Sequence, residues 1–281
     1  MTTVGTCALS VCLIGGLYYG QFATRVDSVR VDAMVTVDGK PLTGLVAEDF
    51  EVRDNGVLQS VRLVGTSASR VDVVLALDMS ASVAGPRLAA LRKAGDSLLD
   101  RLQPDDRAAL LTFSHVVAGR QPLTTNLPRV RRALSTQQAA GGSFVIDGLV
   151  AALGLIEPGT SRNLLIVFTD GIDTGSWLAS ETAIDAAKRS EAVVYAVSTA
   201  GPATSEALRQ IAVESGGRVL DADAASLDAS FVRILDEFRQ RYLLAYTHKE
   251  PPAPGWHRIQ VRVNKRGATV RTRTGYIVPR P

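Results

Sequence analysis

The amino-acid sequence predicts an α/β protein: a doubly wound, mostly parallel sheet flanked by helices, inserted into a small β-sandwich formed by both chain ends. Strand and helix patterns alternate between residues 71 and 240, which is typical of a parallel sheet. Strand patterns alone fill the residues on either side of that region. With 281 residues, 46% of them hydrophobic, the chain has ample apolar content to bury a core.

The first β segment covers residues 28–66. Apolar residues alternate with polar ones from Val29 to Val37, as on a strand with one buried face. Asp38-Gly39 and Asp54-Asn55-Gly56 are turn signals typical of hairpins. Because this segment is too short to form a stable hydrophobic core by itself, we expect it to pack with the strands at the other end of the chain.

The central region begins with an apolar run at residues 71–77, which we expect to be a buried strand. A helix should begin at Pro86, because proline is favoured in the first turn and leucines then recur at helical spacing. The further strands are expected at residues 108–113, 164–168, 193–197 and 218–220, and the further helices at residues 145–156, 181–190, 206–215 and 227–239.

After residue 241 the pattern is again that of strands, expected at residues 242–246, 259–263, 269–273 and 276–278. We therefore predict that residues 25–69 and 241–281 form one sandwich and that residues 70–240 are an inserted α/β domain. The last segment carries nine Lys or Arg against one acid, Glu250. Solvated strand faces explain this excess, and contact with an anionic partner is the alternative. A net charge of +3 does not favour nucleic acid as a partner.

Residues 1–24 are predicted to be a signal peptide or membrane anchor. The stretch between Val4 and Phe22 is apolar or small, and its length fits a membrane span or an export signal. The first cation is Arg25, after the stretch, so a misassigned start codon is the alternative. We expect an exported protein that is periplasmic, membrane-anchored or secreted. Both cysteines, Cys7 and Cys12, lie here, which excludes a disulfide framework or a cysteine metal site elsewhere.

Two segments far apart in the sequence predict one cation site. Asp78-Met79-Ser80-Ala81-Ser82 follows the first central strand, and Thr169-Asp170-Gly171 follows the strand at residues 164–168. Open α/β sheets bind ligands in the crevice at the carboxyl ends of such strands. Carboxylate and hydroxyl oxygens suit Mg²⁺, Mn²⁺ or Ca²⁺ rather than zinc. The alternative is that the aspartates only cap helices or turns.

Together with Gly141-Gly142-Ser143, these two segments resemble the three loops of the von Willebrand factor A (VWA) domain. The resemblance covers about residues 70–240 and implies the metal-ion-dependent adhesion site of that family. Ser143 stands where the family usually has threonine, so the hydroxyl is kept. The implied ligands are Asp78, Ser80, Ser82, Ser143 and Asp170. Segments at residues 45–52, 241–246 and 273–276 are similar to a bacterial VWA-related group, known chiefly from acidobacterial genomes and mostly exported.

This resemblance implies a protein-binding, adhesion-type module. Neutral hydroxyl ligands leave the charge of Mg²⁺ (or of Mn²⁺ or Ca²⁺) under-compensated, so an Asp or Glu carboxylate of a partner protein is a favourable further ligand. The alternatives are an envelope scaffold with a purely structural metal, or an accessory subunit of a larger complex. Asp147 and Asp173 are additional carboxylates that we expect to be structural or to lie behind the ligands.

We expect no enzymatic activity. The sequence has no Gly-x-x-x-x-Gly-Lys-Ser/Thr loop and no Gly-x-Ser-x-Gly elbow. His248-Lys249-Glu250 is similar to the His-x-Glu of zinc deaminases, but no Pro-Cys-x-x-Cys accompanies it, and we interpret His248 as an ordinary loop residue. No general base stands out for metal-assisted hydrolysis. The aromatic residues of the terminal β segments, including Tyr246 and Tyr276, are expected to pack the sandwich.

Overall fold

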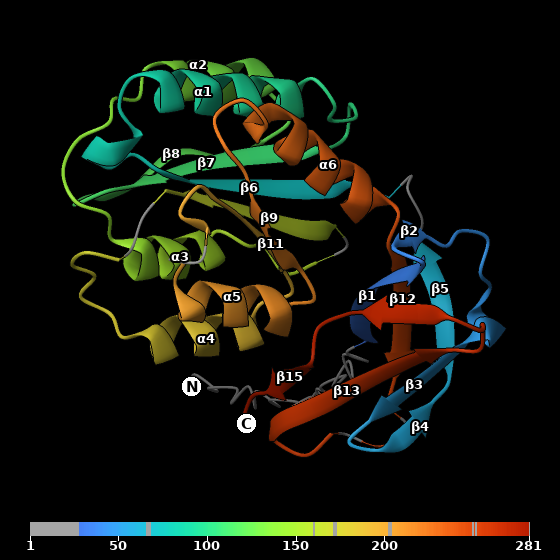
Figure 1. Cartoon of the computed structure of the whole chain (residues 1–281). Helices are drawn as coiled ribbons and strands as arrows, with labels where there is room; N and C mark the ends of the chain where they lie inside the picture. Colours follow the sequence, from blue (N-terminus) through green and yellow to red (C-terminus); the bar gives the residue numbers. More distant parts are fainter. Residues whose placement is uncertain are drawn as a thin grey trace, which may run out of the picture.

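The computed structural model describes residues 28–65, 69–159, 161–170, 173–201, 204–248, 250 and 252–280. An α/β unit, with a six-stranded sheet between two layers of helices, lies beside a unit made of two β-sheets (Figure 1). The expected signal or anchor between Val4 and Phe22 lies outside the described residues. Within the described part, no helix combines the length and the apolar character needed to cross a membrane.

The six-stranded sheet has the order β11-β10-β9-β6-β7-β8. Its strands are β6 (Val71–Asp78), β7 (Arg107–Phe113), β8 (Val117–Thr124), β9 (Arg162–Thr169), β10 (Val193–Ser198) and β11 (Arg218–Asp221). All neighbours are parallel except β7 and β8. The chain builds outward from β6 and then restarts on its other side with β9. The strand order therefore reverses between β6 and β9, and a ligand crevice is expected where these two strands end.

Helices cover both faces of this sheet (Figure 1). One layer consists of α1 (Pro86–Leu99), α2 (Leu127–Ser135) and α6 (Leu227–Arg239), and the other of α3 (Val145–Leu153), α4 (Ser180–Arg189) and α5 (Glu206–Glu214). Leu75 and Leu77 of β6 pack against the first layer, and Val74 and Ala76 pack against the second. Because both faces are covered, every residue of β6 is buried.

The second unit combines strands from both ends of the chain, as the sequence predicted. One sheet contains β14 (Ala268–Arg271), β1 (Ser28–Val37), β12 (Tyr242–Thr247) and β5 (Val61–Gly65), with β2 (Lys40–Pro41) beside β1. The other contains β15 (Gly275–Val278), β13 (Gly255–Val263), β3 (Phe50–Asp54) and β4 (Val57–Gln59), and the short helix η1 (Ala47–Asp49) leads into β3. The two sheets share one core, which includes Val31, Val52 and Leu244.

Both predicted turns join neighbouring strands. Asp38 and Gly39, with φ of 50° and 74°, connect β1 to β2. Asn55 and Gly56, with φ of 47° and 85°, connect β3 to β4. Positive φ at both central residues matches the right-handed twist of the strands, which explains the preference for Asn-Gly and Asp-Gly here.

The sequence patterns did not predict β8 or α2. Strand β8 lies at the edge of the sheet, and its residues are half-buried or exposed, so no apolar run marks it. Helix α2 buries only Val130 and Leu134. The helix expected at residues 145–156 was predicted too long, because α3 ends at Leu153 and Gly154 follows as its C-cap.

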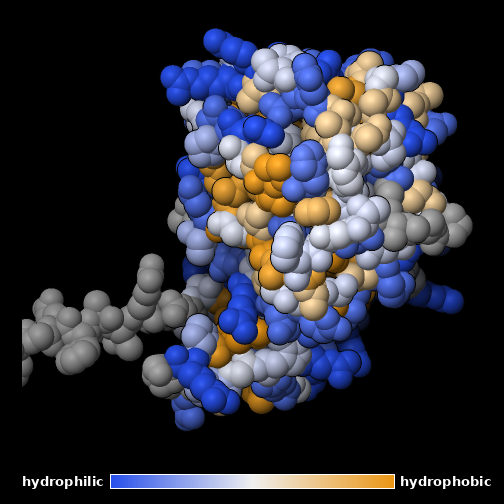
Figure 2. Space-filling view, turned by 90° about the vertical axis from the view of Figure 1, so that its left-hand side faces the viewer, coloured by the Kyte–Doolittle hydropathy of each residue, from blue (hydrophilic) through white to orange (hydrophobic). Residues whose placement is uncertain are grey.

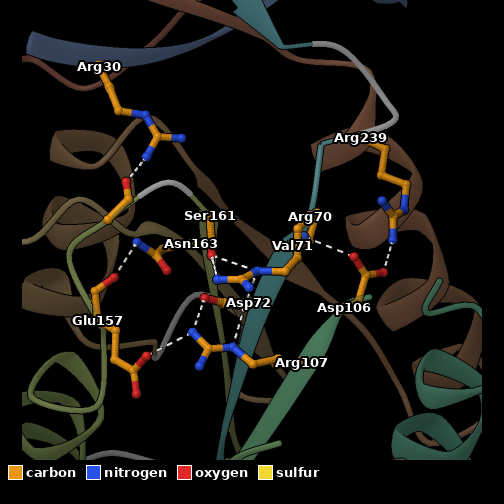
Figure 3. A network of polar contacts seen from close by, with 11 residues as sticks. Arg30, Arg70, Val71, Asp72, Asp106, Arg107, Glu157, Ser161, Asn163 and Arg239 are labelled. Carbon is orange, nitrogen blue, oxygen red and sulfur yellow. Dashed lines mark hydrogen bonds and ion pairs between the residues drawn. The ribbon is translucent and has the colours of Figure 1, made fainter. Parts of the chain in front are cut away.

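At the edge where the central strands begin, buried carboxylates form hydrogen bonds and ion pairs with neighbouring elements (Figure 3). Asp72 of β6 accepts two hydrogen bonds from Arg107 of β7, at 3.0 and 2.6 Å. Asp106 accepts one from the backbone N–H of Val71, at 2.9 Å, and pairs with Arg239 of α6. The strands are thus held at one end, while the predicted cation site lies at the other.

Buried arginines join the two units. Arg162 of β9 donates to the carboxylate of Asp32 in β1 and to the carbonyl of Phe238, the latter at 3.0 Å. Arg241, directly before β12, donates to the hydroxyl oxygen of Tyr195 in β10 at 3.2 Å and to the backbone carbonyl of Asp32 in β1 at 3.0 Å. Since these donors are desolvated, their partners across the interface fix how the units pack.

Candidate functional site

The five implied ligands lie at the edge of the sheet where β6 and β9 end. Asp78 is the last residue of β6, and Asp170 directly follows β9. Ser80 and Ser82 lie at the start of the short helix η2 (Ala81–Val83), and Ser143 lies two residues before α3. The structure therefore brings the three loops together at the point where the strand order reverses.

The oxygens of these side chains form a chain of short contacts. Ser80 Oγ lies 3.1 Å from Ser82 Oγ, and Ser82 Oγ donates to Asp170 Oδ1 at 3.0 Å. Ser143 Oγ donates to Asp78 Oδ2 at 2.6 Å. The backbone N–H of Ser80 donates to Asp78 Oδ1 at 2.8 Å, which links the two halves of the chain of contacts.

The spacing and chemistry of these oxygens fit a small divalent cation. Mg²⁺ takes six oxygens at about 2.1 Å in an octahedron, so neighbouring ligand atoms lie about 3.0 Å apart. The distances of 3.1 Å from Ser80 Oγ to Ser82 Oγ and 3.0 Å from Ser82 Oγ to Asp170 Oδ1 agree with that edge length. Ser82 is exposed, so the cluster can be reached from solvent.

Asp78 is the buried anchor of the cluster. Burial raises the pKa of its carboxyl, and hydrogen bonds from Ser143, Ser80 and Thr169 oppose this rise. Thr169 Oγ1 donates to Asp78 Oδ2 at 2.9 Å. Because three donors already surround this carboxylate, its main effect is to orient the hydroxyl groups around it.

Arg87 belongs to the site and was not identified from the sequence. Its Nη1 lies 2.7 Å from Asp170 Oδ2 and 3.2 Å from the carbonyl oxygen of Ser82. The side chain of Asp170 is 0% exposed, whereas that of Arg87 is 46% exposed. A cation in the first turn of α1 is disfavoured by the helix dipole, and Asp170 offsets that cost. No motif marks this arginine, since only the fold brings it to Asp170.

Backbone hydrogen bonds fix the middle loop against the first. The N–H of Ala81 donates to the carbonyl of Gly141 at 2.9 Å, and the N–H of Ala140 donates to the carbonyl of Met79 at 2.8 Å. Gly141 has a φ of +78°, and a Cβ there would lie 1.8 Å from Nδ1 of His115. Only glycine fits this position without displacing His115.

Asp147 and Asp173 make structural hydrogen bonds. Asp173 accepts from the backbone N–H of Val145 at 2.7 Å, so it satisfies the start of α3 from a different loop. Asp147 accepts from the N–H groups of Trp177 and Leu178, both at 3.0 Å. These contacts agree with the expected structural role of both carboxylates.

Exposed apolar side chains lie in the loops at this edge. Trp177 is 90% exposed, and Leu178 and Val116 are also exposed. The loop that carries Trp177 is tied to the middle loop, because the N–H of Thr174 donates to the carbonyl of Ser143 at 2.8 Å. Figure 2 views the molecule toward the edge at which β6 and β9 end, and shows apolar residues interspersed with hydrophilic ones. Trp177 is the most exposed of these side chains and lies in a loop that contacts the loop of Ser143.

Residues 72–232 match the family model described as von Willebrand factor type A domain. Inter-alpha-trypsin inhibitor heavy chain H4 of Bos taurus is 30% identical over 116 residues, which cover 37% of this chain and 13% of that protein. An uncharacterized protein of Synechocystis sp. is 29% identical over 107 residues, which cover 36% of this chain and 25% of that protein. Each match therefore spans a minor part of the relative.

Solved structures show the same fold. A von Willebrand factor type A protein from Catenulispora acidiphila has a TM-score of 0.55 at 15% identity, covering 89% of this chain and 73% of that chain. An aerotolerance-related membrane protein from Bacteroides fragilis has a TM-score of 0.51 at 18% identity, covering 60% and 99%. The PilB minor pilin from Streptococcus sanguinis has a TM-score of 0.51 at 13% identity, covering 63% and 62%.

Proposed function

This chain belongs to the von Willebrand factor type A domain family, and from that premise we propose a metal-dependent, adhesion-type protein-binding module. The proposed ligands of the divalent cation are Asp78, Ser80, Ser82, Ser143 and Asp170. The observation that carries the proposal is the spacing of the Ser80, Ser82 and Asp170 oxygens, which agrees with the edge of a Mg²⁺ octahedron.

The charges around the site support capture of an acidic side chain. Asp78 and Asp170 contribute two negative charges, and Arg87 contributes one positive charge. A bound Mg²⁺ would supply a coordination position for a carboxylate oxygen and would bring the local charge to +1. Ser143 and Thr169 orient the carboxylate of Asp78, and Arg87 pairs with that of Asp170. The net positive charge that the cation would give the site favours an incoming Asp or Glu carboxylate.

We place the protein outside the cytoplasm, in the envelope or secreted. The apolar stretch between Val4 and Phe22 supports export or anchorage. A membrane protein of Bacteroides fragilis and a streptococcal minor pilin are among the chains with this fold. The division into a targeting segment (1–24), a discontinuous sandwich (25–69 and 241–281) and a metal-binding domain (70–240) is part of the same proposal.

Calorimetric titration of Mg²⁺ and Mn²⁺ into the metal-stripped full chain tests the cation site. We expect saturable binding near one equivalent, and its loss in Asp78→Ala, because the hydroxyl groups lose their buried anchor. Far-UV circular dichroism of the variant checks that the fold is kept. Absence of binding at millimolar metal, or unchanged binding by folded Asp78→Ala, would contradict the metal site.

A second measurement tests partner capture. A blocked peptide with one aspartate should bind the Mg²⁺-loaded protein more tightly than its asparagine counterpart, and EDTA should abolish the difference. Asp78→Ala keeps Arg87 and removes one negative charge, so an aspartate preference that persists in this variant reports general electrostatic attraction rather than metal coordination. Metal binding without any aspartate preference would favour the envelope scaffold with a structural metal.

A further inference from the structure

A second cluster of metal-binding side chains lies in the β-sandwich, away from the loops of the first site. Asp54 ends β3, His248 follows β12, and His257 lies in β13. One ligand atom from each lies within 4.8 Å of the other two. Asp54 Oδ1 is 2.8 Å from His257 Nδ1, and Asp54 Oδ2 is 3.2 Å from His248 Nε2. His248, interpreted from the sequence as an ordinary loop residue, follows β12, and its Nε2 also lies 2.6 Å from the hydroxyl oxygen of Tyr276.

The two ring nitrogens of His257 each face an oxygen atom: Nε2 faces a backbone carbonyl, and Nδ1 faces the carboxylate of Asp54. Its Nε2 lies 2.8 Å from the carbonyl oxygen of Ala253, which can only accept, so Nε2 carries a hydrogen. In a neutral ring the lone pair of Nδ1 then faces the carboxylate of Asp54, and two acceptors meet. A second proton on the ring or a metal ion on Nδ1 removes this conflict. Histidines that bind metals commonly donate their other N–H to a backbone carbonyl in this way.

The carboxylate of Asp54 is oriented by two buried or half-buried phenols. Tyr246 and Tyr276 donate to Asp54 Oδ2 at 2.7 and 2.8 Å. The two phenols hold the carboxylate in place, with Oδ1 directed at His257 and Oδ2 near His248. Hydrogen bonds of this kind, behind a ligand, strengthen metal binding.

We propose that Asp54, His248 and His257 form a zinc site. One carboxylate and two imidazoles are ligands typical of Zn²⁺, whereas Mg²⁺ and Ca²⁺ prefer oxygen alone. With bonds of about 2.0–2.1 Å in a tetrahedron, ligand atoms lie about 3.3 Å apart. The distances of 2.8 Å from Asp54 Oδ1 to His257 Nδ1 and 3.2 Å from Asp54 Oδ2 to His248 Nε2 are close to this spacing. All three ligand atoms lie within 4.8 Å of one another, so side-chain rearrangement is enough to place them around one ion.

The proposed site has room for a fourth ligand and joins distant parts of the chain. A cavity of about 720 Å³ is lined by all three residues and by Val57 and Leu58. Water or an anionic group can complete the coordination from this side. Asp54 and His257 belong to one sheet, whereas His248 follows a strand of the other. Zinc would therefore link the two sheets and the two chain ends that form them.

Zinc titration of the untagged full chain, monitored by calorimetry, tests this site. The protein carries Asp78→Ala to remove the first site and Cys7→Ser and Cys12→Ser to remove the two thiols. We expect one equivalent of Zn²⁺ to bind with a dissociation constant of about 1 µM or tighter and to raise the thermal midpoint. His248→Ala should weaken binding by about 100-fold or more, because it removes one of three protein ligands.

His115→Ala is the matched control, because His115 is the one histidine outside the cluster and should leave zinc affinity unchanged. Unaltered affinity in folded His248→Ala, or the absence of binding at 100 µM zinc, would overturn the proposal. Co²⁺ added to the same Asp78→Ala, Cys7→Ser, Cys12→Ser protein provides a second readout. Visible absorption bands typical of tetrahedral nitrogen and oxygen coordination are expected, and an octahedral spectrum like that of aqueous Co²⁺ would overturn the site.

Discussion

At the scale of single residues, Arg87 adds a positive charge to the oxygen atoms of the proposed cation site. Its guanidinium lies 2.7 Å from Asp170 and remains 46% exposed, so it neutralises a proposed ligand while facing solvent. The same charge opposes a metal ion and attracts a carboxylate. Metal affinity and partner affinity should therefore respond in opposite directions when this charge is removed.

Arg87→Gln is expected to tighten Mg²⁺ binding and to weaken binding of the aspartate peptide. Two charges a few ångströms apart near a protein surface interact by about 1 kcal/mol after screening, which corresponds to about a five-fold change in each constant. Calorimetry with Mg²⁺ and then with the peptide measures both. Arg87→Lys is the matched control, because it keeps the charge, and both constants should stay closer to wild type. A change of both affinities in the same direction would contradict this role.

Trp177 is expected to contribute to partner binding but not to metal binding. Its ring is 90% exposed in a loop tied to the middle loop of the site, and exposed tryptophans commonly become interface anchors. Trp177→Ala should weaken the binding of a protein partner by about 2 kcal/mol. The affinity for Mg²⁺ should stay unchanged. Trp256→Ala is a control at the other tryptophan, in β13. An equal effect of both variants would argue against a specific contact by Trp177.

At the scale of elements, the start of α3 depends on a loop that follows a different strand. The helix has no side-chain cap of its own. Asp173 accepts from the N–H of Val145 at 2.7 Å, and Ser176 Oγ accepts from the N–H groups of Ile146 and Asp147 at 3.1 and 3.2 Å. The loop after β9 thus acts as the cap of α3, and through Thr174 it also holds Ser143, two residues before the helix.

Asp173→Ala is expected to lower the free energy of unfolding by about 1–2 kcal/mol, because the N–H of Val145 loses its acceptor and the N–H of Ile146 keeps only Ser176. Urea denaturation measures the change. Asp173→Asn keeps one acceptor oxygen and should lose less. If Asp173→Ala unfolds within a few tenths of a kcal/mol of wild type, the loop does not cap this helix.

At the scale of the whole molecule, Glu237 of α6 connects the two units. Tyr195 donates to its carboxylate at 2.7 Å and Arg218 at 2.5 Å, and Arg271 of the sandwich pairs with it as well. Burial alone would raise its pKa, but the hydrogen bond from Tyr195 and the charges of Arg271 and Arg218 outweigh burial. The pKa of Glu237 therefore lies below its usual value of 4.5.

Glu237→Gln should lower stability by about 2 kcal/mol at pH 7 and progressively less in acid. A depressed pKa means that the unfolded chain takes up the proton first as the pH falls. The stability from Glu237 is then complete above its usual pKa and is lost as the pH falls through the folded value. Urea denaturation of both proteins between pH 7 and pH 3 measures this difference.

Glu157→Gln is the matched control, because Glu157 pairs with Arg107 at 2.8 Å but is 59% exposed. An exposed ion pair contributes less than about 1 kcal/mol, so this variant should differ little from wild type at any pH. A pH-independent cost of Glu237→Gln would mean that its packing, rather than its charge, links the units.

Local patterns were sufficient for the parts of the fold with strong periodicity. The buried run at residues 71–77 and the Asn55-Gly56 turn were predictable, because burial and positive φ each restrict the residue types allowed. Strand β8 was not, since an edge strand with half-buried residues carries no such restriction. The partners of His248 were also not predictable, because Asp54 lies far from it in the sequence.

The sequence by itself determined the α/β fold, the sandwich formed by both chain ends and the family, because strand and helix periods and short loop motifs are local properties of the chain. The sequence also predicted five oxygen ligands for a cation, namely Asp78, Ser80, Ser82, Ser143 and Asp170. Only the tertiary structure decided that Arg87 faces Asp170, that Asp173 caps α3, and that Asp54 meets His248 and His257. These contacts join residues from separate strands and loops, and their distances depend on how whole elements pack.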